Sequence, residues 1–140
     1  MLSMKAKYAL KSLVVMAKQE KKMLPIKAIA QEADVPPKFL EAILLDLKRH
    51  GILDSKRGIF GGYFLSRPAR DIRIGDVIRM VDGPLAPIPC ASTTAYRRCD
   101  DCVDENSCDV RRVMLKVRNA IAGVLDGMTL KELVNQGGAI

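Results

Sequence analysis

Four cysteines, the only ones in the chain, lie within nineteen residues of one another. They are Cys90, Cys99, Cys102 and Cys108, with the spacing Cys-x8-Cys-x2-Cys-x5-Cys. The stretch around them, PIPCASTTAYRRCDDCVDENSC, is polar, acidic and bounded by prolines, which is typical of a loop rather than of a packed core. Thiolates gathered on one loop are the ligands that a soft metal or an iron–sulfur cluster needs. We therefore predict that the four cysteines hold a metal or a cluster.

The spacing leaves two other interpretations open. It matches neither the paired Cys-x2-Cys of a zinc ribbon nor the Cys-x2-Cys-x2-Cys run of a ferredoxin, so the clustering itself supports metal binding. A thiol–disulfide switch is the second interpretation, and cysteines without chemistry are the third.

Four arginines flank the cysteines: Arg97, Arg98, Arg111 and Arg112. We expect their charge to lower the pKa of the thiols, which favours both metal binding and a switch.

The segments that position this loop predict a mainly α-helical protein with one small β-hairpin. Apolar residues at helical spacing predict helices over residues 3–19, 26–34, 37–50, 74–83 and 108–125, and Thr129 with Glu132 forms a capping box that begins a last short helix. The helices at 26–34 and 37–50, joined by a short turn with two prolines, predict a helix-turn-helix. Its second helix is expected to turn five apolar residues inward: Phe39, Leu40, Ile43, Leu44 and Leu47. Strands at 52–56 and 63–66 flank GIFGG, which predicts a hairpin wing.

The charge is concentrated in the N-terminal half. Residues 1–73 hold 15 Lys and Arg against 7 Asp and Glu, whereas residues 74–140 hold 8 against 9. This bias favours a polyanionic partner, nucleic acid ahead of membrane. No apolar run approaches the roughly 18–20 residues of a membrane span, and no export signal is recognisable, so we expect a cytoplasmic protein without membrane contact. No catalytic motif appears, and we expect no enzymatic activity.

The predicted DNA contacts lie at the start of the first helix, at the start of the helix over 37–50 and around the glycine hairpin. They are Lys5, Lys7, Pro37, Lys38, Glu41, Ala42, Lys56, Arg57 and Gly61. Lys38 can reach a phosphate or a guanine, and Arg57 on the wing suits the negative potential of the minor groove. Glu41 either accepts a hydrogen bond from a cytosine amino group or is a carboxylate in the first turn of the helix, where the helix dipole favours it.

The last long helix carries an unusually extended apolar stripe. Its members are Val110, Val113, Met114, Val117, Ala120, Ile121, Val124 and Leu125. One small domain offers little surface to cover such a stripe, so we expect a helix–helix seam between two copies of the chain. The alternative is an ordinary amphipathic helix packed on its own domain.

Several motifs resemble one family of bacterial winged-helix transcription regulators. Arg57-Gly58 followed by Gly61-Gly62-Tyr63, in a chain that opens with Lys7-Tyr8-Ala9, is similar to the family that contains the iron–sulfur cluster regulator and the nitric-oxide-sensing repressor. The resemblance extends over nearly all of residues 1–134. It implies a homodimeric DNA-binding protein, often a repressor, that binds a near-palindromic operator and dimerises through the long helix. It also implies minor-groove contact by Arg57 and base discrimination by Glu41.

The cysteines depart from the pattern that the resemblance implies. Cluster-binding members use three cysteines, commonly about five residues apart, plus a fourth ligand that is not cysteine. Cys102 and Cys108 match the last two of these, but Cys90 is displaced and Cys99 is additional. Either Cys99 completes an all-cysteine site, or three cysteines hold a cluster with one labile iron.

Two further departures concern single positions. The fourth ligands of two branches of the family, a histidine and an aspartate, correspond here to Arg111 and to a position near Lys7. Pro36 stands where relatives often have a serine that caps the recognition helix, so a hydroxyl contact is lost.

These observations predict four units. A winged helix-turn-helix domain spans residues 1–83, a cysteine sensor loop 84–107, a dimerisation helix with a short terminal helix 108–134, and a disordered tail 135–140. The predicted function is a homodimeric repressor whose DNA affinity is controlled by a [2Fe–2S] or [4Fe–4S] cluster, which aerobic preparation can remove. The alternatives are a regulator with a Cys99–Cys102 disulfide switch, a zinc site, or a protein–protein adaptor for a metabolic enzyme.

Overall fold

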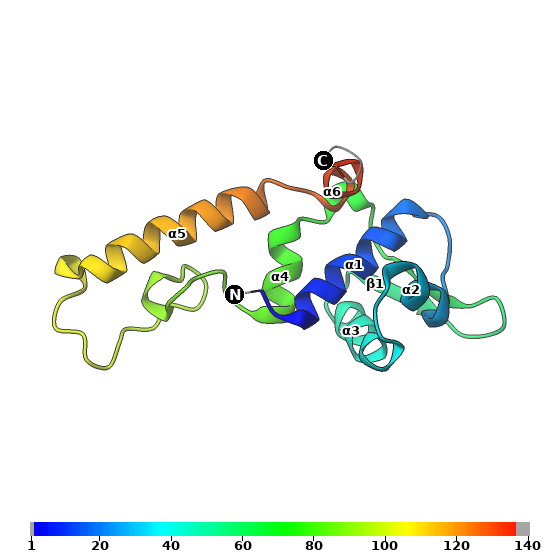
Figure 1. Ribbon diagram of the computed structural model, residues 1–140, viewed down its shortest axis with the longest axis horizontal. Coiled ribbons are helices and arrows are strands. Elements are labelled where there is room, and N and C mark those ends of the chain that lie inside the picture. Colours follow the sequence, from blue (N-terminus) through cyan, green and yellow to red (C-terminus); the bar gives the residue numbers. More distant parts are fainter. Residues whose placement is uncertain (1, 137–140) are drawn as a thin grey trace.

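The structure, a computed structural model, describes residues 2–136 and is mainly helical, as predicted (Figure 1). The main elements are α1 (Met4–Lys18), α2 (Ile26–Ala33), α3 (Pro37–Arg49), β1 (Leu53–Lys56), β2 (Gly62–Leu65), α4 (Ile74–Asp82), α5 (Asp109–Asp126) and α6 (Leu130–Gln136). Short 3-10 turns lie at Ala69–Asp71, Pro89–Ala91 and Glu105–Ser107. None of the described helices is long and apolar enough to cross a membrane.

The core forms around α1, which contacts α2, α3, α4 and α6. Leu13 of α1 and Leu40 and Leu44 of α3 are fully buried there, as the apolar spacing predicted. The prediction for Phe39 is wrong, because its side chain is 55% exposed and lies beside Tyr8, with ring centroids 6.4 Å apart. Phe39 sits at the edge of the apolar face of α3, where the core no longer covers it.

The helix-turn-helix depends on how α2 and α3 end. α2 ends at Asp34 in a left-handed conformation (φ 54°), and α3 begins directly after Pro36. After the last residue of α3, Gly51 is in a left-handed conformation (φ 79°) and its N–H donates to the carbonyl oxygen of Lys48. The N–H of Ile52 donates to the carbonyl oxygen of Leu47. This pair of bonds is a Schellman ending, which turns the chain straight into the wing.

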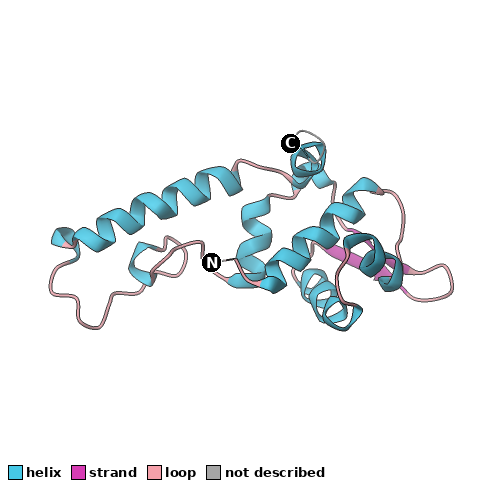
Figure 2. Cartoon of the chain, viewed as in Figure 1, coloured by secondary structure: helices cyan, strands magenta, loops and turns pink. Residues whose placement is uncertain are grey.

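The wing is an antiparallel hairpin whose base is joined to the helix-turn-helix (Figure 2). Leu53 pairs with Leu65, and Lys56 with Gly62, so both strands differ by one residue from the predicted ones. The backbones of Leu24 and Tyr63 exchange two hydrogen bonds of 2.9 and 2.8 Å. These bonds attach the outgoing strand to the segment just before α2.

The C-terminal part consists of a long helix that runs away from the core and a short one that returns to it. α5 and the loop before it extend to the opposite end of the molecule from the wing (Figure 1). α6 packs on α1 through the fully buried Leu130, and backbone hydrogen bonds pair Ile72 with Leu130 and Ile74 with Met128. The sequence predicted that α6 belongs with α5, but the apolar side chains of α6 pack on the N-terminal core.

The predicted tail also differs from the structure. Asn135 and Gln136 belong to α6, because the last helix continues past the expected end at residue 134. The rest of the predicted tail, residues 137–140, lies outside the described residues.

Candidate functional site

The outer face of α3 presents the predicted recognition residues to solvent. All four of them are exposed: Pro37, Lys38, Glu41 and Ala42. They lie on the side of the helix opposite the buried Leu40 and Leu44. The helix therefore offers one polar face to an external partner, as a recognition helix does.

Of the two predicted lysines on α1, one already has a partner. Lys5 Nζ lies 2.5 Å from a carboxylate oxygen of Asp46 on α3, whereas the side chain of Lys7 is exposed. The hydrogen bond and charge of Lys5 lower the pKa of the Asp46 carboxyl, although partial burial opposes this. Lys5 therefore has to exchange Asp46 for a phosphate before it can contact DNA.

The wing places two basic side chains next to a tight turn. Lys56 and Arg57 are exposed, and the N–H of Gly61 donates to the carbonyl of Gly58 at 3.0 Å. A Cβ on Gly61 would lie 2.1 Å from the carbonyl oxygen of Lys56. Gly61 was predicted as a DNA contact, and the structure shows in addition that the turn requires a glycine there.

All four cysteines line one cavity of about 270 Å³ between the loop and the start of α5. Cys90 is buried, Cys99 is exposed, and the other two are intermediate. The sulfurs of Cys90 and Cys99 lie 4.0 Å apart. Cys108 is the N-cap residue of α5, where its sulfur accepts the N–H of Arg111 at 3.4 Å.

The donor set suits a thiolate-bound metal, but the ligands are not assembled. Two thiolates on one tetrahedral metal stand about 3.8 Å apart if each metal–sulfur bond is about 2.3 Å. The separation of Cys90 and Cys99 matches this value. No three Cys, His, Asp or Glu side chains among the described residues converge closely enough to hold a metal ion. In the same loop, one carboxylate oxygen of Glu105 is buried without a hydrogen-bond partner, and a cation or a donor would satisfy it.

The predicted effect of the arginines on the thiols is wrong for Cys99. The pKa of its thiol is raised, chiefly by the hydrogen bond and charge of Cys90, then by desolvation and by the charges of Asp101 and Cys102. The arginines bind loop backbone instead: Arg98 donates to the carbonyl of Cys102 and Arg111 to that of Cys90, each at 3.2 Å. Arg97 and Arg112 pair with Asp100 and Asp109, so none of the four guanidinium groups is shown bonded to a sulfur among the described residues.

The only sulfur–sulfur contact in the described residues also differs from the predicted disulfide pair. The disulfide switch that was the alternative to a cluster places the disulfide between Cys99 and Cys102. The structure joins them by a backbone hydrogen bond of 3.1 Å, while the Cys99 sulfur lies against Cys90. The N–H of Arg97 donates to the carbonyl of Pro89 at 3.2 Å, so the segment between them folds back and brings the two sulfurs together.

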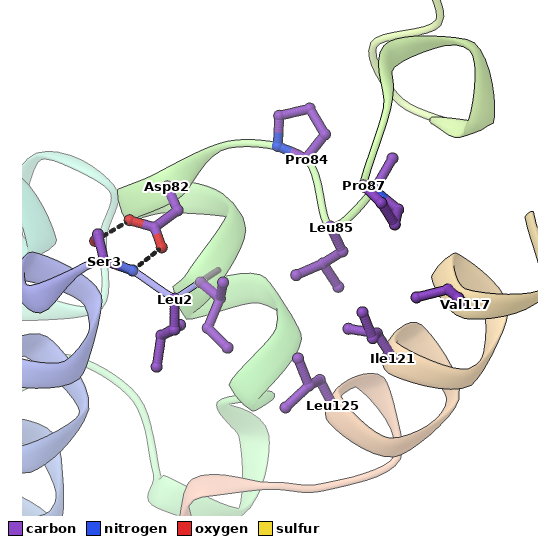
Figure 3. Close-up of a pocket in the computed structure, with 11 residues that line it drawn as sticks. Leu2, Ser3, Asp82, Pro84, Leu85, Pro87, Val117, Ile121 and Leu125 are labelled. Atoms are coloured by element: carbon purple, nitrogen blue, oxygen red, sulfur yellow. Dashed lines mark hydrogen bonds between the residues drawn. The ribbon is translucent and has the colours of Figure 1, made fainter. Parts of the chain in front are cut away.

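The apolar stripe of α5 is uncovered. Five of its members are between 37 and 63% exposed: Val110, Val113, Val117, Ile121 and Val124. The stripe borders a groove of about 640 Å³ between α5, α4 and the segment 84–87, with Leu2, Leu85 and Leu125 on its walls (Figure 3). The alternative that α5 buries its stripe on its own domain is therefore not what the structure shows.

A clamp at the far end of α5 was missed by sequence reasoning. Asp126 accepts two hydrogen bonds from the Arg79 guanidinium, at 2.7 and 2.8 Å, and its backbone carbonyl accepts one from Arg73 at 2.6 Å. Arg79 lowers the pKa of the Asp126 carboxyl, and the same contact raises the pKa of Arg79. The one available signal was an acidic residue at a helix C-terminus, where the dipole disfavours it unless a cation is near.

A helix-turn-helix with an exposed second helix and a basic wing is the architecture of a winged-helix DNA-binding transcription regulator. Residues 2–136 match the family described as Rrf2, iron-dependent transcriptional regulator. The chain belongs to the Rrf2 family. Relatives of this kind are named transcriptional regulators, which confirms that the chain is not an enzyme.

Three relatives cover nearly the whole chain. An rrf2-like HTH-type transcriptional regulator of Rhodobacter capsulatus is 41% identical over 98% of this chain and 94% of its own. The structure of CymR, the global cysteine regulator of Bacillus subtilis, is 29% identical with a TM-score of 0.79 and covers 96% of both chains. The structure of IscR from T. potens is 28% identical with a TM-score of 0.75, over 97% of this chain and 87% of that one.

Proposed function

We propose that this chain is a cytoplasmic homodimeric repressor whose DNA affinity is controlled by an iron–sulfur cluster on the Cys90–Cys108 loop. The observation that carries the proposal is the single cavity lined by all four cysteines at the N-terminus of α5. Cysteine thiolates hold such clusters, and a bound cluster supplies sensitivity to redox state, iron supply or nitric oxide. The residues that would hold it are Cys90, Cys99, Cys102 and Cys108.

DNA is the proposed partner of the opposite end of the molecule. The recognition helix would lie in a major groove with Lys38 and Glu41 toward base edges, while Arg57 on the wing reaches the adjacent minor groove. The concentration of basic residues in the N-terminal half supports this arrangement. Because the proposed protein is a dimer, its operator is expected to be near-palindromic.

A second copy of the chain is the proposed cover for α5. Val117, Ile121 and Leu125 border the same groove as Leu85, so an apolar ridge from a second α5 could fill it. An exposed stripe of this length is typical of a surface that is buried in an assembly.

The proposed control passes along α5, because this helix is held at both ends. Cys108 caps its first turn, and Arg79 and Arg73 hold Asp126 at its last turn against α4. Loss of ligation would loosen the loop and the first turn of α5, and the clamp would carry that change to the DNA-binding domain. A change in the angle between the two recognition helices of a dimer alters the half-site spacing it can match.

A thiol switch is the second candidate, and one contact favours it. The sulfurs of Cys90 and Cys99 at 4.0 Å could form a disulfide after a small movement, since disulfides join cysteines with Cβ atoms about 3.5–4.5 Å apart. The solved relative named as a cysteine regulator adds weight to control without a cluster. The solved relative named IscR adds weight to the cluster.

The deciding experiment is anaerobic purification of the full chain followed by absorption spectroscopy and assays for iron, sulfide and zinc. A cluster predicts broad absorbance between roughly 320 and 420 nm with near-equal iron and sulfide. Zinc without colour would support a zinc site. A metal-free protein whose free thiols fall by two on mild oxidation, in the wild type but not in Cys90→Ala, would support the switch.

DNA binding is tested on the same sample by anisotropy titrations over a range of salt concentrations. A regulator is expected to lose affinity linearly in log[salt] and to prefer some duplexes strongly. Weak binding without duplex preference, together with co-purification of an enzyme, would support the adaptor instead.

A further inference from the structure

We infer that Ile59 and Phe60, at the tip of the wing, form an apolar wedge that enters the DNA minor groove and opens a base step. The two side chains are 96% and 90% exposed. They lie in the loop between β1 and β2, and this loop projects from the end of the molecule opposite α5 (Figure 1). This inference rests on the proposed function, because it takes duplex DNA as the partner.

The turn that carries the pair is built to hold it outward. Ile59 and Phe60 are the two central residues of a tight turn closed by the Gly61 N–H and the Gly58 carbonyl, 3.0 Å apart. Gly58 has a positive φ of 113°, a conformation that favours glycine. Both flanking glycines are thus needed for the backbone, and the two residues between them are free of that role.

The wing is also anchored at its base. Its outgoing strand is joined to Leu24 by two backbone hydrogen bonds at Tyr63. A Cβ on Gly62 would lie 2.5 Å from the backbone of Leu24, so the two segments are in close contact. The base of the wing is therefore fixed to the helix-turn-helix, which sets the position from which the tip meets a partner.

The charge around the tip selects a polyanion. Lys56 and Arg57 adjoin the turn, and no Asp or Glu occurs between Ser55 and Arg70. Arginine in the minor groove follows its negative potential, and minor-groove proteins often insert Ile or Phe beside such cations to unstack a base step. The combination of a cationic base and an apolar tip matches that mode.

The wedge adds sequence preference without a hydrogen bond to a base. Pyrimidine–purine steps such as TA and CA/TG unstack most easily, so the pair should favour such a step where the wing lies. Arg57 alone would favour a narrow minor groove, as in A-tracts. The two predictions differ at the same position of the operator.

The test uses the full-length wild type and two double variants in selections from a random duplex pool. In Ile59→Ala/Phe60→Ala the wedge is removed, and in Ile59→Leu/Phe60→Leu it is kept apolar. On the duplex selected by the wild type, the alanine variant should lose at least about tenfold in affinity, as much as a mismatched base pair costs, with an unchanged salt slope. It should also lose the pyrimidine–purine preference. The leucine variant should retain both.

A direct readout is 2-aminopurine placed at successive positions of the selected duplex. The wild type and the leucine variant should raise its fluorescence at one step beside the half-site, and the alanine variant should not. If the alanine variant matches the wild type in affinity, step preference and fluorescence, the inference is wrong. Binding to vesicles of anionic lipid is measured for the same proteins. An alanine variant that loses vesicle binding but keeps DNA binding would also overturn the inference. Failure of the wild type to select any duplex instead refutes the proposed function.

Discussion

Gly75→Ala should change the sign of its effect on stability when Asp126 is removed. Gly75 is the second residue of α4, where alanine should stabilise the helix by at most the roughly 0.5–1 kcal/mol that it gains over glycine in the middle of a helix. In this chain an added Cβ would lie 2.0 Å from a carboxylate oxygen of Asp126. The Asp126 side chain must therefore move, and at least one of its two hydrogen bonds with Arg79 must lengthen.

The magnitude follows from the geometry of that pair. Exposed ion pairs contribute about 0–1 kcal/mol, whereas hydrogen bonds to charged groups contribute about 1.5–3 kcal/mol. The Arg79 side chain is 23% exposed and that of Asp126 is 38% exposed, so we take an intermediate value of about 1–2 kcal/mol for the bidentate pair. In the wild type this loss exceeds the helix gain, and Gly75→Ala should destabilise by roughly 0.5–1 kcal/mol.

In an Asp126→Ala background the carboxylate is absent, and the remaining close neighbour of the added Cβ, Arg79 Nη1 at 3.2 Å, is the end of a flexible side chain that Asp126 no longer holds. The same Gly75→Ala substitution should then stabilise by at most about 0.5–1 kcal/mol, the helix preference of a mid-helix position. At roughly 3–4 °C per kcal/mol for a chain of this size, Tm should fall by a few degrees in the wild type and rise by a few in Asp126→Ala.

The assay is a double-mutant cycle in urea and by calorimetry, at one protein concentration because dimerisation adds to stability. Destabilisation by Gly75→Ala in both backgrounds would mean that the added methyl clashes with something other than Asp126. Stabilisation in both would mean that the pair with Arg79 does not hold α5 to α4.

Four other predictions follow from single contacts. Asp46→Asn should release Lys5 for phosphate, so that binding to a non-specific duplex strengthens severalfold and the salt slope in anisotropy titrations steepens by about 1; an unchanged slope would place Lys5 away from DNA. Cys108→Ser and Cys108→Ala should both lose cluster absorbance, but only alanine should lose the N-cap of α5, at about 1 kcal/mol in urea unfolding. Ile121→Lys should give monomers in sedimentation with unchanged circular dichroism; persistent dimers would contradict the α5 seam. Arg79 lowers the pKa of Asp126, so the pair's contribution should be complete above about pH 4, the ordinary carboxyl pKa, and fade as pH falls through the lowered value. Asp126→Asn should lack that acid-side loss in urea titrations.

Local signals were sufficient for most of the fold. Proline and glycine punctuation located both ends of α3, because the turn before it and the Schellman ending after it depend on nearest neighbours. The stripe of α5 was predicted to lack cover from its own domain, since its apolar residues exceed what one small core can bury, and the single chain leaves it exposed. Phe39 is the exception, because the edge of an apolar face is set by the neighbouring helix and not by spacing.

Contacts between distant segments were beyond the sequence. Asp126 and Arg79 are 47 positions apart, and neither has a neighbour in sequence that marks the pair. The sulfur partner of Cys99 was also missed, because the course of the loop, not sequence distance, brings Cys90 to it. The same holds for α6, whose return to α1 depends on backbone pairing at Ile72.

The contact at the C-terminal end of α5 is an ion pair, and the contact at its N-terminal end depends on a cysteine sulfur. Only the second contact would respond to a metal or to oxidation, which suits a sensor. The clamp at Asp126 consists of groups that stay charged at neutral pH, so it is a fixed connection to the DNA-binding domain. The cap at Cys108 is a sulfur that accepts a backbone N–H, and such a bond strengthens when the acceptor is ionised. On the proposed function, ligation keeps Cys108 as a thiolate, so that metal binding and helix capping favour the same ordered first turn. Loss of the ligated metal would weaken the cap and the order of the first turn together. An N-cap contributes about 1 kcal/mol to helix stability. A coupling free energy of 1–3 kcal/mol corresponds to about a 5–150-fold change in affinity, so this cap together with loop order is enough to account for regulation through α5.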